Sequence, residues 1–143
     1  MGIIDKNGEP KVVYHTTSDR RKGEKMSTGE FRSFAIEVLT GLYRSEGLKI
    51  TNINMDDDYP RFVMESQNGK IYYVVIDATI FPNRPNSGFI KNNHSYFLEL
   101  ARRHNAIPVY ASIAFVNATR KDRSEMICGD GYFVVFKGLS SLL

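Results

Sequence analysis

The sequence lacks the residues and segments that several classes of protein require. It has one cysteine in 143 residues, which excludes an intramolecular disulfide framework and a cysteine-based zinc site and favours a reducing, cytoplasmic setting. No apolar run approaches the ~18 residues of a membrane span, and the opening residues MGIIDKNGEP carry no signal-peptide pattern. We therefore expect a cytoplasmic protein with no membrane partner.

The chain also lacks a strong charge bias. Its 19 Lys and Arg stand against 16 Asp and Glu, for a net charge of +3, and the excess lies late in the sequence. A mixed excess of this size permits nucleic-acid binding, but recognition of a phosphate backbone needs basic groups clustered on one face. Composition alone therefore does not assign a partner.

The length and the apolar periodicities predict one α/β domain over residues 27–143, preceded by a partly mobile N-terminal arm over residues 1–26. Within the arm, Lys11 to Thr16 could form a short extended piece, and the charged run Ser18 to Lys25 is expected to be a mobile loop. Ser27 and Glu30 form the pattern of a capping box before a helix over Thr28 to Glu46.

The rest of the chain predicts a mixed sheet of about five strands flanked by two main helices, in the order α-β-β-β-α-β-β. Asn92 or Asn93 could cap a second helix that reaches about His104. A strand, a helix and a strand in succession imply a parallel pair joined by a crossover. The expected strands cover residues 48–54, 61–66, 71–78, 107–116 and 132–137.

One acid lies where a sheet does not readily accept it. Asp77 is in the run Ile71 to Ala78, which is otherwise apolar on both faces. An unpaired carboxylate in such a setting costs several kcal/mol, or it stays protonated. Because alternate strand residues share a face, Asp77 should point to the same side as Tyr73, Val75 and Thr79.

The expected elements follow the order helix, three strands, helix and strand, and Asp77 lies on the third of these strands. In this arrangement the sequence resembles the PD-(D/E)XK nuclease-like superfamily, whose fold is restriction-endonuclease-like. The resemblance implies a site in which an Asp after a Pro and a D/E-x-K triplet hold Mg²⁺, with a Glu on the first helix. On this chain the triplet falls on Asp77, Ala78 and Thr79, the Pro-Asp pair on Pro60 and Arg61, and the helix acid on Glu37. Thr cannot replace an ammonium group and Arg cannot bind a metal, so the resemblance implies a domain without catalysis.

The substitutions allow two interpretations. If Arg61 lies beside Asp77, its guanidinium could neutralise the carboxylate where the family holds its metal. Alternatively, Arg61 is a solvated residue at a strand edge and Asp77 caps a turn. An active site with relocated groups is a further alternative, in which Asp57 or Asp58 supplies a metal-binding acid, and a second set supplies the cation, namely Lys91, Arg102 or Arg103.

Other polar residues give weaker indications. The helical wheel places Glu37 away from the apolar stripe, on an edge or surface of its helix. Cys128 has no defined base near it in sequence, so we expect a turn residue rather than a nucleophile. His15, His94 and His104 lack metal-ligand spacing. The best nucleic-acid contacts are Arg120, Lys121 and Arg123, and the second best are Arg20, Arg21 and Lys22.

These observations leave three hypotheses for the function. The first is a catalytically inactive nuclease-like domain that binds DNA or RNA or acts in assembly, with no cofactor. The second is an active nuclease that uses Mg²⁺, held by Asp77 and Asp58. The third is a protein-interaction module, such as a homodimer, whose 8 Tyr and 9 Phe serve a core or an interface equally well.

Overall fold

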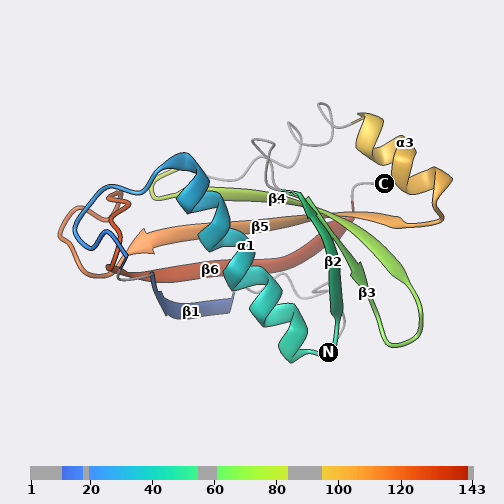
Figure 1. Cartoon of the computed structure of the whole chain (residues 1–143), viewed down its shortest axis with the longest axis horizontal. Helices are drawn as coiled ribbons and strands as arrows, with labels where there is room; N and C mark the ends of the chain where they lie inside the picture. The colour runs from blue at the N-terminus through green and yellow to red at the C-terminus, as the bar shows by residue number, and fades with distance from the viewer. Residues whose placement is uncertain (1–10, 18–19, 55–60, 84–94, 142–143) are drawn as a thin grey trace.

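The computed structural model describes residues 11–17, 20–54, 61–83 and 95–141. They form one six-stranded mixed sheet and two helices (Figure 1). In chain order the elements are β1 (Lys11–Thr16), α1 (Thr28–Ser45), β2 (Lys49–Asn54), β3 (Arg61–Glu65), β4 (Ile71–Ile80), α3 (Ser95–Arg103), β5 (Ile107–Asn117) and β6 (Gly131–Ser141).

The strands lie in the order β1-β6-β5-β4-β3-β2. The parallel pair is β4 with β5, as the sequence predicts, and the other neighbouring strands are antiparallel. The expected count of about five strands is too low. The sixth strand is β1, the short extended piece before the domain, and it pairs along its whole length with β6. A six-residue edge strand gains its stability from this distant partner, so its own sequence carries little signal.

The α1 helix begins where the sequence predicts. The Ser27 hydroxyl accepts a hydrogen bond from the Glu30 amide at 3.1 Å, and the Glu30 carboxylate accepts one from the Ser27 amide at 3.0 Å, which together make the capping box. Glu46 is the C-cap, and Gly47 follows with φ at 86°, a conformation that glycine adopts without a steric penalty. The predicted start of the second helix at Asn92 or Asn93 lies outside the described residues.

The two helices cover opposite faces of the sheet. Alternation along β4 sends Val74 and Ile76 into the main core under α1, whereas Tyr73 and Val75 belong to a second cluster with Phe97 of α3. Figure 1 shows α1 running across one face and α3 near one end of the sheet. Neither described helix is long and apolar enough to cross a membrane.

Candidate functional site

Asp77 lies on the face of β4 that α3 partly covers. Its side chain is buried, with 7% of its surface exposed, and the Tyr110 hydroxyl donates a hydrogen bond to its Oδ2 at 2.9 Å. Tyr110 comes from β5, where it is the register partner of Val75, and both residues pack with Phe97. The hydroxyl offsets part of the cost of burying the carboxylate. No local sequence pattern indicates this partner.

Arg61 lies on the same face as Asp77. It is the first residue of β3, and its register partner is Val75 on β4. Val75 comes two residues before Asp77 on that strand. Diagonal neighbours in an antiparallel pair lie within reach of a long side chain. The Arg61 guanidinium carbon is 5.6 Å from the centre of the Phe97 ring, a cation–π distance. The geometry therefore allows the Arg61–Asp77 ion pair, which stays a prediction.

Thr79 lies where the predicted resemblance would place a lysine. It is two residues beyond Asp77 and therefore on the same face of β4. Its Oγ1 is shielded from solvent and has no hydrogen-bond partner within the described residues. A neutral hydroxyl can neither orient a nucleophile as an ammonium group does nor balance the charge of a phosphate.

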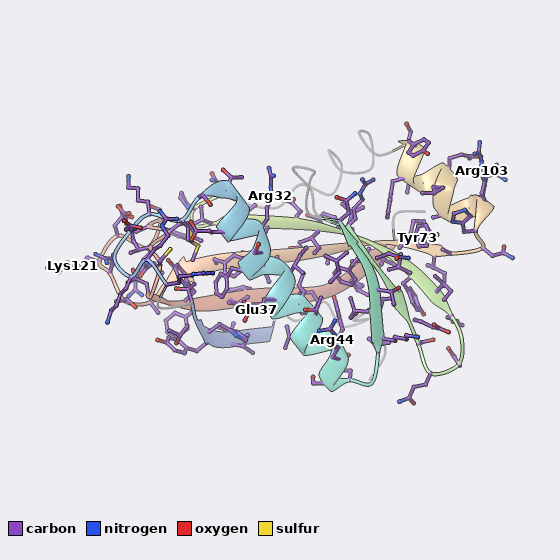
Figure 2. All side chains as sticks on the ribbon, in the orientation of Figure 1. Arg32, Glu37, Arg44, Tyr73, Arg103 and Lys121 are labelled. Atoms are coloured by element: carbon purple, nitrogen blue, oxygen red, sulfur yellow. The ribbon has the colours of Figure 1, made fainter. Side chains whose placement is uncertain are left out.

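The structure places Glu37 on the opposite side of the sheet from Asp77. Glu37 is exposed on α1, and Figure 2 shows it along the helix between Arg32 and Arg44. It lines a cavity of about 650 Å³ between α1 and the loops that carry Thr17, Met26 and Cys128. The helix acid and the strand acid are therefore not brought together, because α1 covers the face that Ile76, not Asp77, presents.

The residues predicted for a relocated catalytic site are only partly described. Asp57, Asp58 and Lys91 lie outside them. Arg102 and Arg103 both contact Glu99 on the exposed surface of α3, and the hydrogen bond from Arg102 holds the pKa of Glu99 below its usual value. Within the described part of the chain, no group of three or more His, Cys, Asp or Glu side chains could hold a metal ion.

The loop between β5 and β6 is built around a buried polar network. Asn117 Nδ2 donates to the Asp130 carboxylate at 2.9 Å, and Arg120 Nε donates to the same carboxylate at 2.6 Å. Arg123 donates to the Asn117 carbonyl at 3.1 Å. Two of the three predicted nucleic-acid contacts, Arg120 and Arg123, therefore also hold the loop together, whereas Lys121 is exposed.

This loop is joined by backbone hydrogen bonds to the charged segment before α1. The Gly23 amide donates to the Cys128 carbonyl at 2.9 Å, the Cys128 amide to the Glu24 carbonyl at 2.8 Å, and the Met26 amide to the Met126 carbonyl at 2.8 Å. We call residues 20–26 and 118–130 together the paired-loop end; Figure 1 shows them at the end of the sheet away from α3. The expected mobile loop is thus, over its described residues, paired with a second loop.

The remaining candidate residues are the cysteine and the three histidines, and those that the structure describes contact other residues of the fold. Cys128 is buried and its thiol lies 3.5 Å from the Glu30 carboxylate. Burial, and then the hydrogen bond to Glu30, raises the pKa of the thiol, which disfavours the thiolate that a nucleophile needs. His104 contacts the Tyr73 hydroxyl, His15 lies on β1, and His94 is outside the described residues.

The fold and contacts define a mixed α/β domain with one curled six-stranded sheet and a helix on each face. Residues 29–142 match the sequence model of a family described as a domain of unknown function, DUF8840, and the chain belongs to this family. No curated protein and no solved structure matches the chain.

Proposed function

We propose that this domain has a restriction-endonuclease-like core without catalytic activity and binds DNA or RNA through the paired-loop end. The order of elements supports the core assignment: α1 precedes the antiparallel strands β2, β3 and β4, then α3 crosses over to the parallel strand β5. The placement of Asp77 beside Tyr110, and across the sheet from Glu37, supports the loss of catalysis.

The observation that carries the binding proposal is the charge of the paired-loop end. Its two segments contain seven basic and four acidic residues, a difference of +3 that equals the formal net charge of the whole chain. The sequence separates these segments by about a hundred positions, and the backbone hydrogen bonds between them bring the charges to one end. A clustered basic surface attracts a phosphate backbone and releases its counterions.

The test is fluorescence anisotropy with labelled single- and double-stranded oligonucleotides at 50 to 200 mM salt. Lys22→Glu and Lys121→Glu alter exposed lysines at the paired-loop end. Each should weaken binding several-fold and reduce the salt slope by about one or more. The matched control is Lys70→Glu, an exposed lysine next to the β3–β4 turn, which should bind like the wild type. Absence of binding at 50 mM salt, or equal losses in all three variants, would refute the proposal.

Catalysis is tested separately with supercoiled plasmid in Mg²⁺ or Mn²⁺. We expect no cleavage. The informative variant is Asp77→Asn, which keeps an acceptor for the Tyr110 hydroxyl but removes the charge. Metal-dependent cleavage by the wild type that disappears in Asp77→Asn would establish an active nuclease and overturn the assignment of an inactive core.

A further inference from the structure

The two edge strands of the sheet differ in how readily they could pair with a strand from another molecule. β2 forms one edge, and its pairing with β3 shifts register between Thr51 and Asn54, with Asn52 at a φ of 52°. Such an irregularity disrupts the row of backbone groups that another strand would need. β1 forms the other edge and pairs with β6 without a register shift.

The β1 edge carries one feature that usually opposes strand addition, the lysine at its first position, Lys11. The remaining residues, 12 to 16, read VVYHT and include no proline, lysine, arginine or acid. Val13 packs against the main core, so Val12 and Tyr14 point to the other face, where they are 60% and 58% exposed. Phe133 of β6 is the register partner of Tyr14 and is 42% exposed. We call Val12, Tyr14 and Phe133 the β1 patch.

The β1 patch is an ordered apolar surface. The Tyr14 and Phe133 rings meet edge to face, with their centres 5.9 Å apart. The Tyr14 ring lies over Gly131, where an added β carbon would lie 1.9 Å from the Tyr14 hydroxyl oxygen. Glycine at position 131 therefore leaves room for the Tyr14 ring, so the patch extends from the edge strand onto β6.

We propose that the domain forms a two-fold dimer by antiparallel pairing of β1 with β1 of a second copy, in a register centred on Val13. In this register Val12 of each copy faces Tyr14 of the other, a favourable pair of a β-branched and an aromatic side chain. In the same register Lys11 of each copy faces His15 of the other, so no two lysines, arginines or acids oppose each other. The segment is thus complementary to itself, which is what a symmetric dimer requires.

Sedimentation equilibrium of the protein without nucleic acid tests this dimer. Five paired residues and three apolar side chains per copy are fewer than in a standard interface, so we expect a dissociation constant on the order of 10 μM. Tyr14→Lys should weaken the dimer tenfold or more. The matched control is Ile53→Lys on β2, where the side chain is 44% exposed, and it should self-associate like the wild type.

A monomeric wild type at all accessible concentrations would overturn the dimer, and so would a dimer as tight in Tyr14→Lys as in the wild type. The register is tested by mixing Val12→Cys with Tyr14→Cys, because directly opposed residues are close enough for a disulfide. The mixed pair should cross-link in preference to either variant with itself; the reverse order would exclude the register centred on Val13. These measurements do not depend on nucleic-acid binding, so the two proposals can fail independently.

Discussion

Tyr43 carries a hydroxyl group into the apolar core. The side chain is 3% exposed and packs against Phe62 and Phe136, and its oxygen has no hydrogen-bond partner within the described residues. Burial raises the pKa of this phenol well above its usual value. A buried polar group without a partner costs about 1 to 3 kcal/mol of stability.

We therefore expect Tyr43→Phe to leave the free energy of unfolding unchanged or to raise it by about 1 kcal/mol, since it keeps the ring and removes the unpaired hydroxyl. The control is Tyr132→Phe. The Tyr132 hydroxyl accepts from the Ile127 amide at 2.7 Å and donates to the Ile127 carbonyl at 3.0 Å. Its loss should cost about 1 to 3 kcal/mol. Urea unfolding of both variants measures the difference, and a large loss in Tyr43→Phe would show that its hydroxyl has a partner.

At the scale of the element, α1 depends on an ionised carboxylate at its first turn. The hydrogen bond from the Ser27 amide, the largest contribution, lowers the pKa of Glu30, and the Cys128 thiol and the Arg21 guanidinium act in the same direction. The folded protein therefore binds the Glu30 proton less readily than the unfolded chain. Ionised Glu30 stabilises the fold above its unfolded pKa, and this contribution disappears as the pH falls through the lower folded pKa.

As the pH is lowered below the ordinary glutamate pKa of about 4.3, we expect the free energy of unfolding to decrease more steeply in the wild type than in Glu30→Gln. Glutamine keeps an oxygen that can accept the Ser27 amide but does not titrate. Urea midpoints measured from pH 3 to pH 7 give the two slopes, and their difference isolates Glu30 from the other acids. Parallel curves for both proteins would contradict the role of the charge.

At the scale of the whole molecule, a network of buried hydrogen bonds holds the paired-loop end together. Asn117 is fully buried and joins four loop groups: it donates to Asp130 and to the Glu125 carbonyl, and its Oδ1 accepts the amides of Thr119 and Arg120. Thr17, after β1, donates its hydroxyl to the Asp130 carbonyl at 2.9 Å. The network thus connects the residue after β1 to the loop between β5 and β6, about a hundred positions away in the sequence.

Asn117→Ala should lower the free energy of unfolding by about 2 to 4 kcal/mol, because several buried polar groups lose their partners at once. It should also weaken oligonucleotide binding by disordering both loops. Lys121→Glu should weaken binding with an unchanged melting temperature, since Lys121 is exposed and outside the network. Thermal unfolding and anisotropy on the same samples separate the two effects. An Asn117→Ala variant as stable as the wild type would show that the network contributes little.

Much of the fold follows from local sequence signals. The Ser27–Glu30 capping box, the apolar stripe of α1 and the alternation in β3 depend on neighbouring residues, so both the elements and the parallel β4–β5 pair were predictable. β1 was not predictable as part of the sheet, because its stability comes from β6, more than a hundred residues away. The partners of the candidate residues were equally hidden: neither Tyr110 beside Asp77 nor Asp130 beside Arg120 has a local signal.

The sequence by itself determined the periods of the helices and strands, the single acid in an apolar strand and the small basic excess. Only the tertiary structure decided that Glu37 and Asp77 lie on opposite faces, because the face that a strand residue occupies depends on which helix covers it. The tertiary structure also brings two distant loops together through backbone hydrogen bonds. Their combined charge of +3 equals the net charge of the chain and lies at one end of the sheet. Charge is a property of composition, whereas its clustering depends on long-range pairing.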